Sequence, residues 1–297
     1  MPALRTVDAA SVRLGSGEKG RSSKSHRDRS PSAPSIPYQD QTHDAMIGRG
    51  GFGRVYRAHW KTTDRSVAVK YLNKKFWHHD MAVRALIAES QKAQRIIHSH
   101  IICHHGWGQA PSGAPFLVMD LVDGPNLTDW IHDSSFDVAE VQSCATQICD
   151  SLVTLHQIGI LHGDISPANI LRRASHDFVL TDFGFSRSID DGHSAPGGTL
   201  GFLAPEQFSS AFGTISERTD IYGFGALLYF LVTHRAPFER DDERDIIHRI
   251  LSSDRPPEVA FPGMPLAKLT TLARACLAKE PSERITTMEE VRSALHQ

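Results

Sequence analysis

The chain has 297 residues, of which 40% are hydrophobic and 22% charged, an ordinary composition for a folded protein. Its formal net charge of −2 gives no indication of nucleic-acid binding, and no apolar run reaches the roughly 18 residues that a membrane helix needs. The first residues lack the apolar core of a signal peptide, and the four cysteines form no Cys-x-x-Cys pair. We therefore expect reduced thiols in a cytoplasmic protein without a nucleic-acid or membrane partner, whose oligomeric state the sequence does not indicate.

Residues 1–40 differ in composition from the rest of the chain. They are rich in Ser, Arg, Lys and Pro, and seven basic and four acidic residues give them a net charge of +3. Such a segment buries too little apolar surface to offset the entropy lost on ordering, so we expect a disordered basic tail. An alternative is a regulatory arm phosphorylated at serines such as Ser22, Ser23, Ser25 or Ser30.

A glycine-rich stretch follows the tail. Residues 47–55 read Ile-Gly-Arg-Gly-Gly-Phe-Gly-Arg-Val and fit the pattern G-x-G-x-x-G-x-V. Glycines at this spacing let a hairpin lie close over phosphates with its N–H groups facing them. The same spacing in dinucleotide-binding folds opens a helix, whereas residues 55–60 are strand-like here. Residues 66–72 form an alternating strand that carries Lys70, a candidate phosphate ligand.

A helix is expected over residues 81–97, with Glu89 inside it. The histidines at 98, 100, 104 and 105 follow, in a segment that reads as turn and strand. We do not expect these histidines to bind a metal, because we identify no carboxylate or thiol that supports them. Residues 116–122 form an apolar strand that runs into a short connector, and residues 138–159 form a long helical pattern that stops at Gly159.

Two acidic motifs lie beyond this helix. The stretch 161–171 carries Asp164 and, five residues later, Asn169, and the triplet Asp-Phe-Gly begins at Asp182. A single Asp-Phe-Gly is about as often an ordinary turn as a functional motif. Further motifs then follow in order: Gly-Thr at 198–199, Ala-Pro-Glu at 204–206, Arg-Thr-Asp-Ile-Tyr-Gly-Phe-Gly at 218–225, and Pro-Ser-Glu-Arg at 281–284.

Together these motifs resemble the eukaryotic-like Ser/Thr protein kinases of the protein-kinase superfamily, over about residues 44 to 296. Any one motif is weak, whereas the ordered set is specific. The resemblance implies an α+β, bilobal fold with ATP in the cleft between the lobes. The small antiparallel β lobe, with one regulatory helix, is expected over residues 41–122, and the larger, mainly α-helical lobe over residues 123–297.

The resemblance also implies roles for individual residues. Asp164 would accept the proton of an attacking hydroxyl, Asn169 and Asp182 would bind Mg²⁺, Lys70 would hold the α- and β-phosphates, and Glu89 would orient Lys70. Thr199 would bond to Asp164 and help to seat a protein Ser or Thr substrate. The nucleotide would lie against Ile47, Gly48, Arg49, Gly50, Gly51, Phe52, Gly53, Val55, Ala68, Lys70, Met119, Asp120 and Val122.

Two further roles are structural. Asp220 would hold the backbone of the catalytic loop, the stretch 161–171, and Arg284 would form a buried ion pair with Glu206.

Three positions depart from the family pattern. Gly163 replaces the arginine that normally binds an activation-loop phosphate, and Ala195, beside Ser194, stands where the main phosphorylated residue is expected. We therefore predict a kinase that is active without activation-loop phosphorylation. Ser166 replaces the lysine that neutralises the transferring phosphate, and the other position for a loop cation holds Ala168, so a reduced rate is expected.

Two alternatives remain open. The His-Gly-Asp at 162–164 also resembles the loop of aminoglycoside- and choline-type phosphotransferases, which act on small molecules. A catalytically weak pseudokinase that binds ATP and partners is the non-enzymatic alternative. The chain keeps the lysine, the base and the metal aspartate that pseudokinases usually lose, so we expect an enzyme.

Overall fold

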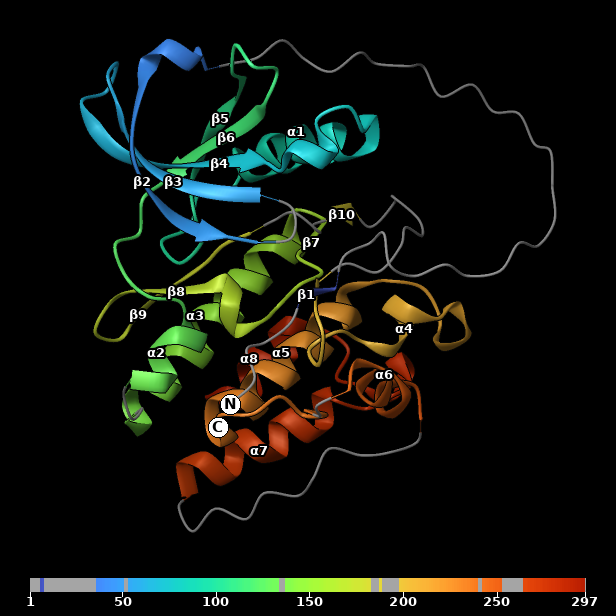
Figure 1. Ribbon diagram of the computed structural model, residues 1–297. Helices are drawn as coiled ribbons and strands as arrows, with labels where there is room; N and C mark the ends of the chain where they lie inside the picture. Colours follow the sequence, from blue (N-terminus) through green and yellow to red (C-terminus); the bar gives the residue numbers. More distant parts are fainter. Residues whose placement is uncertain are drawn as a thin grey trace, which may run out of the picture.

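The structure is a computed structural model that describes residues 6–7, 36–50, 53–133, 137–182, 187–188, 198–239, 242–252 and 264–296. It has two lobes joined by the segment after Asp120 (Figure 1). An antiparallel β-sheet with one main helix makes up the smaller lobe, and the larger lobe is mainly helical, which confirms the expected α+β fold.

The sheet of the smaller lobe has the strand order β2-β3-β4-β6-β5. Its strands are β2 (Gln41–Arg49), β3 (Gly53–Trp60), β4 (Arg65–Leu72), β5 (His104–Gln109) and β6 (Pro115–Asp120). Between β4 and β5 lie the short η2 (Lys74–Phe76) and the helix α1 (Asp80–Ala93), which packs against β5 and β6. The helix ends four residues before the expected limit at 97, and Ile97 lies 96% exposed.

The packed lobe begins earlier than residue 41. Ile36 is buried against Phe116 and Val118, and its N–H donates to the carbonyl of Trp107 at 3.0 Å. The turn η1 (Tyr38–Asp40) then leads directly into β2. A second part of the expected tail, β1 (Thr6–Val7), pairs antiparallel with β11 (Gly198–Thr199) in the larger lobe. Apolar burial thus attaches Ile36 to the smaller lobe, and strand pairing attaches Thr6–Val7 to the larger one, both within the segment 1–40 that is expected to be a tail.

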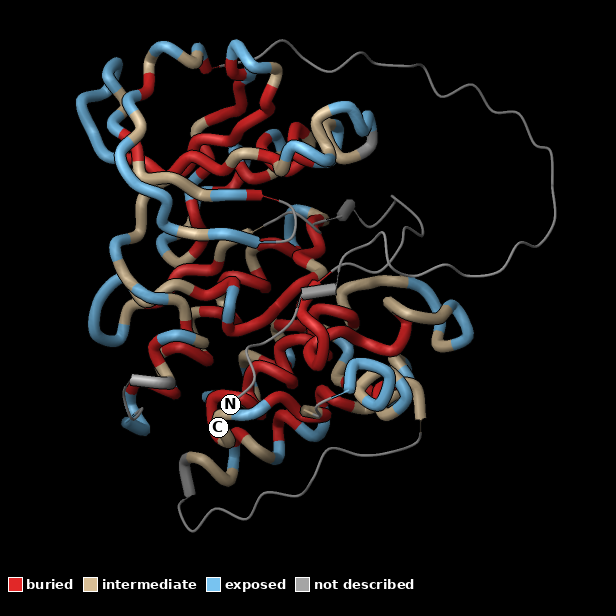
Figure 2. Tube along the Cα trace, viewed as in Figure 1, coloured by how far each residue is buried: buried red, intermediate tan, exposed pale blue. Residues whose placement is uncertain are grey.

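The larger lobe is built around α3 (Val138–Gln157) and α5 (Glu217–Thr233), which α7 (Met264–Cys276) and α8 (Met288–Leu295) flank. The Asp137 side chain caps α3 by accepting the N–H of Glu140 at 2.7 Å. In α5 every residue from Thr219 to Val232 is buried, and Figure 2 shows the surrounding core. Such a helix is stable only inside a large apolar cluster, where each fully buried large side chain contributes about 1.5–3 kcal/mol.

The remaining elements surround the cleft or cover the helical core. They are α2 (Leu127–Asp133), β7 (Ile160–Leu161), η3 (Pro167–Asn169), β8 (Ile170–Ala174), β9 (Asp177–Leu180), β10 (Arg187–Ser188), α4 (Pro205–Phe208), η4 (Ser210–Phe212), α6 (Glu243–Leu251) and η5 (Pro281–Glu283). β8 pairs with β9 and β10 pairs with β7, both antiparallel. In the described part of the chain, no helix has the length and apolarity needed to cross a membrane.

Candidate active site

A cleft of about 570 Å³ lies between the two lobes. Its lining includes almost every residue predicted to hold the nucleotide or to act on it. These are Ile47, Gly48, Arg49, Gly50, Gly53, Val55, Ala68, Lys70, Glu89, Met119, Asp120, Val122, Asp164, Asn169, Asp182 and Thr199. Ser166 lies fully buried beneath this lining, and Gly51 and Phe52 fall outside the described residues.

The β2–β3 hairpin forms the roof of the cleft. Where the two strands approach the turn, the N–H of Gly50, just after β2, donates to the carbonyl of Gly53, the first residue of β3, at 2.9 Å. Gly53 is required by close packing, since a Cβ at this position would lie 2.5 Å from the carbonyl oxygen of Tyr71. The glycine therefore lets β3 lie against β4, the strand that carries Lys70.

Lys70 lies between two carboxylates in the cleft. Its Nζ is 2.6 Å from Asp182 Oδ1 and 3.4 Å from Glu89 Oε1, so α1 contributes one partner and the segment after β9 the other. Burial alone would lower the pKa of Lys70, but the carboxylates of Asp182 and Glu89 raise it above its usual value. Lys70 therefore stays charged at any physiological pH and suits a site for phosphate groups.

Asp182 has an unusual backbone conformation. Its φ is +65°, in the left-handed region that costs a residue with a side chain on the order of 1 kcal/mol. The neighbouring N–H of Thr181 is tied to the carbonyl of Asn169 at 2.9 Å, so the strained turn is held beside the catalytic loop. Strain of this kind persists where surrounding contacts enforce it, as at binding and catalytic sites.

Hydrogen bonds hold both carboxylate oxygens of Asp164. Oδ1 accepts the backbone N–H of Thr199 at 2.8 Å, and Oδ2 accepts the side-chain amide of Asn169 at 2.8 Å. Burial raises the pKa of Asp164 above its usual range, although the hydrogen bond from Thr199 opposes this shift. Asp164 is thus oriented and made more basic, as a group that takes a proton from a hydroxyl requires.

Thr199 contacts the catalytic loop through two groups. Its N–H reaches Asp164, whereas its hydroxyl donates to Ser166 Oγ at 2.9 Å. The preceding Gly198 has a φ of +136°, and a Cβ there would lie 2.9 Å from Asp164 Oδ1. The Gly-Thr pair therefore packs directly on Asp164, and Ser166, at the position where the family pattern has a lysine, accepts a hydrogen bond from Thr199.

Gly163 has a conformational reason to be glycine, since its φ is +80°. Its N–H donates to Asp220 Oδ1 at 2.8 Å, and its carbonyl accepts from Gln207 Nε2 at 2.8 Å. Asp220 Oδ2 also accepts the N–H of His162 at 2.9 Å and lies 2.9 Å from His156 Nε2. An arginine at 163 would have to adopt the left-handed region, at a cost of about 1–2 kcal/mol.

A fully buried ion pair braces the lobe below the site. Arg284 Nη1 and Nη2 lie 2.6 and 2.8 Å from the two carboxylate oxygens of Glu206. Thr219 donates its hydroxyl to the same carboxylate at 2.8 Å. The pair links Glu206, which follows the Gly-Thr segment, to Arg284 near the end of the chain. This link helps to hold the Gly-Thr segment in place against Asp164.

Asn169 and Asp182 provide the donor set for a metal. A side-chain amide oxygen and a carboxylate are the hard oxygen ligands that Mg²⁺ accepts, with its remaining positions filled by water and phosphate. The Asn169 amide nitrogen is held by Asp164, at the side-chain Oδ2 and at the backbone carbonyl. That contact leaves the amide oxygen as the atom available to a cation, so the residues fit the group.

Several residues of the cleft were not singled out from the sequence. Leu171 lies two residues after Asn169 on β8, so strand alternation could have placed it in the lining. Arg57 on β3 and Asp123, in the segment after Asp120 that joins the lobes (the hinge), also line it and form an ion pair at 2.6 Å. No sequence signal links these two, because they are brought together only by the approach of the lobes.

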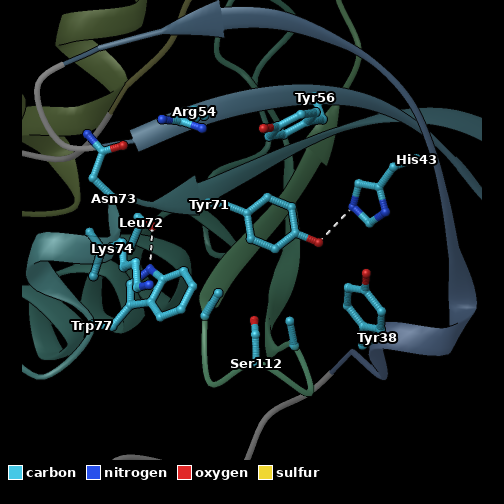
Figure 3. A pocket seen from close by; sticks show the side chains of 12 residues that line it. Tyr38, His43, Arg54, Tyr56, Tyr71, Leu72, Asn73, Lys74, Trp77 and Ser112 are labelled. Atoms are coloured by element: carbon cyan, nitrogen blue, oxygen red, sulfur yellow. Dashed lines mark hydrogen bonds between the residues drawn. The ribbon is translucent and has the colours of Figure 1, made fainter.

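A second cavity of about 470 Å³ lies on the smaller lobe, away from the predicted site residues. Figure 3 shows the rings of Tyr38, Tyr56 and Tyr71 around His43, with the hydroxyl of Tyr71 2.7 Å from His43 Nε2. These rings come from η1, β2, β3 and β4. None of the carboxylates predicted to act on phosphates lines this cavity, so the cleft between the lobes is the candidate active site.

Comparisons with known proteins agree with this geometry. A family model described as the protein kinase domain matches residues 42–295. The chain is 31% identical over 260 residues to the serine/threonine-protein kinase PknB of Mycobacterium leprae, covering 84% of this chain and 41% of that protein. It is 31% identical over 261 residues to PknB of Mycobacterium tuberculosis, with the same coverage of both proteins.

A third relative is the serine/threonine-protein kinase pkn3 of Myxococcus xanthus, 29% identical over 269 residues, with 85% of this chain and 48% of that protein covered. The chain thus spans less than half the length of these relatives. The domain match covers most of the chain and includes the whole cleft described above. The chain belongs to the protein kinase family.

Proposed function

We propose that this chain transfers the γ-phosphate of ATP to Ser or Thr hydroxyls of proteins, with Mg²⁺ as cofactor. One observation carries the proposal. A buried carboxylate, Asp164, is held at both oxygens within the cleft where Lys70 lies between Asp182 and Glu89. Positioned charge of this kind is what phosphoryl transfer requires. The names of the relatives support a Ser/Thr acceptor over the small-molecule and pseudokinase alternatives.

The chain's own residues perform the following steps. Lys70 binds the α- and β-phosphates, and the backbone of the β2–β3 hairpin covers them. Asp164 orients the substrate hydroxyl and takes its proton as the oxygen attacks the γ-phosphorus, while the bond to the β,γ-bridging oxygen breaks and ADP leaves. Asn169 and Asp182 would hold Mg²⁺, which would neutralise charge on the phosphates.

We further propose that the site works without activation-loop phosphorylation. Gly163 at the arginine position offers no cation for a loop phosphate, and its φ of +80° suits the glycine. Ser194 and Ala195 lie outside the described residues. Phosphatase-treated protein should keep its full rate, and a large gain on phosphorylation at Ser194 would contradict the proposal.

The test of the main proposal is transfer of labelled phosphate from ATP and Mg²⁺ to a mixed Ser, Thr and Tyr peptide array. Label on Ser or Thr that disappears in Asp164→Asn supports a protein kinase. The control is Asp150→Asn, an exchange of the same kind on the partly exposed face of α3. ATP binding without transfer to the array or to small hydroxylated molecules would refute it and favour a pseudokinase.

A further inference from the structure

Three side chains with metal-binding atoms meet where the hinge leaves the smaller lobe. They are Cys103, His105 and Asp120, and their thiol, imidazole and carboxylate atoms all lie within 4.8 Å of one another. His105 Nε2 is 2.8 Å from Asp120 Oδ1. This corrects the expectation from the sequence that no thiol or carboxylate supports the histidines of this segment.

The sheet itself creates the cluster. Asp120 ends β6, and its backbone N–H donates to the carbonyl of Cys103 at 2.9 Å. The pairing of β5 with β6 shifts register between His104 and Gly106, a bulge that changes the direction of the side chain between them. His105 thereby reaches Asp120, while the ring of Trp60 packs against it with centroids 5.2 Å apart.

We propose that Cys103, His105 and Asp120 bind a divalent transition-metal ion of the Zn²⁺ type, with water completing four-fold coordination. Thiolate, imidazole and carboxylate are the usual ligands of Zn²⁺, and the soft thiolate selects against Mg²⁺. Metal–ligand bonds of about 2.0–2.3 Å in a tetrahedron place donor atoms about 3.3–3.8 Å apart. The three donor atoms lie within 4.8 Å of one another, so small side-chain movements bring them to this spacing.

The accessibility of the cluster agrees with a site that an ion can enter. Cys103 is exposed, whereas Cys144, Cys149 and Cys276 are buried. The side chain of Asp120 is half exposed, and that of His105 is 12% exposed. Two ligands can therefore move to meet an ion while the imidazole is fixed against Trp60, which gives a partly preorganised site.

The site has a consequence for the nucleotide cleft, and this part rests on the proposed function. Asp120 also lines that cleft and is among the residues expected to lie against the nucleotide. A metal ion on the Asp120 carboxylate would fix the end of β6 and raise the affinity of the cleft for the adenine ring of the nucleotide. By linkage, binding of the adenine ring would raise the affinity for the metal ion by the same factor. We expect an effect of about fivefold, the lower end of typical couplings between sites.

The experiment is a titration of the full, tag-free chain with Co²⁺ in the absence of nucleotide. One equivalent should give a thiolate-to-Co²⁺ charge-transfer band and the intense visible bands of four-coordinate Co²⁺, both displaced by Zn²⁺. Cys103→Ser should abolish the charge-transfer band, and His105→Gln should weaken Co²⁺ binding by more than about tenfold, since one of three protein ligands is lost.

The matched control is His59→Gln. His59 on β3 pairs with Asp64, in the turn that follows β3, at 3.2 Å; both side chains are exposed, and the variant should leave the titration unchanged. A Co²⁺ spectrum without the thiolate band, or one that survives Cys103→Ser, overturns the proposal. Thermal melting of each variant checks that the fold is retained.

Coupling is measured with adenosine, which has no phosphates to chelate the metal. Calorimetric affinity for adenosine should rise about fivefold with Zn²⁺ in the wild type and stay constant in Cys103→Ser. A normal Co²⁺ spectrum with a constant adenosine affinity refutes the coupling. A normal spectrum with no adenosine binding at all instead counts against the proposed kinase function.

Discussion

Removal of Arg284 tests how far a single buried ion pair supports the larger lobe. Both Arg284 and Glu206 have fully buried side chains, joined by two parallel hydrogen bonds of 2.6 and 2.8 Å. Arg284→Met keeps most of the apolar volume but leaves the Glu206 carboxylate buried without a cation. Breaking a buried pair on one side costs about 3–5 kcal/mol.

That cost converts into a measurable shift in melting temperature. A domain of this size melts about 2–4 °C lower for each kcal/mol lost, so Arg284→Met should melt about 6–20 °C lower. Arg284 also donates to the carbonyls of Arg218, Ala278 and Lys279, which lose their partner as well. The free energy of unfolding from urea titration gives the value directly.

Two further variants make the reasoning refutable. Arg292→Met removes an arginine from a surface pair with Asp150, at 3.6 Å and about 40% exposed, and should cost less than about 1 kcal/mol. Adding Glu206→Leu to Arg284→Met removes the orphaned charge and should recover at least about 2 kcal/mol. A loss below about 1 kcal/mol in Arg284→Met, or no recovery in the double variant, would refute the argument.

Further predictions concern the catalytic loop. Ser166→Ala removes the acceptor of the Thr199 hydroxyl and should lower kcat by about fivefold, which corresponds to the loss of one hydrogen bond of about 1 kcal/mol. Ser166→Thr keeps a hydroxyl and should restore kcat, whereas an unchanged kcat in Ser166→Ala would show that this hydrogen bond does not contribute to the reaction. Because burial raises the pKa of Asp164, kcat/KM should fall as pH drops through a value above the ordinary 3.8, and an acidic limb below 3.8 would contradict this. Asp220→Asn weakens the acceptor of two loop N–H groups and should cost about 1.5–3 kcal/mol in urea unfolding. Burial alone would lower the pKa of His156, but the hydrogen bond to Asp220 raises it above 6.5. The protonated imidazole therefore stabilises the fold fully below pH 6.5, and this stabilisation is lost as the pH rises through the raised pKa. His156→Gln should lower the free energy of unfolding more at about pH 6 than at about pH 9, and equal losses at both pH values would contradict the shift.

Most of the candidate site is predictable from the sequence because short motifs specify local backbone geometry. The glycines at 48, 50 and 53 form a close hairpin, and the spacing from Asp164 to Asn169 lets one residue hold the other across a single turn. Alternation along β4 puts Lys70 on the face of the sheet that lines the cleft. These arrangements depend on residues near one another in the chain or on one strand, so their pattern survives in the linear sequence.

Other features required the tertiary structure. The composition of residues 1–40 indicates disorder, but Ile36 packs in an apolar cluster of side chains from β3, β4 and β6, and Thr6–Val7 pairs with β11. The lysine-to-serine exchange at 166 could be read from the sequence, whereas the bond of Ser166 to Thr199 could not.

The sequence by itself therefore determined the family, the two-lobed fold and most of the residues that line the cleft between the lobes. Only the tertiary structure decided which distant side chains meet, as Cys103 and His105 do with Asp120, and Arg57 with Asp123. The physical reason is that such contacts follow from strand register, a bulge and the approach of two lobes. These are properties of the whole packed chain and leave no periodicity in any one segment.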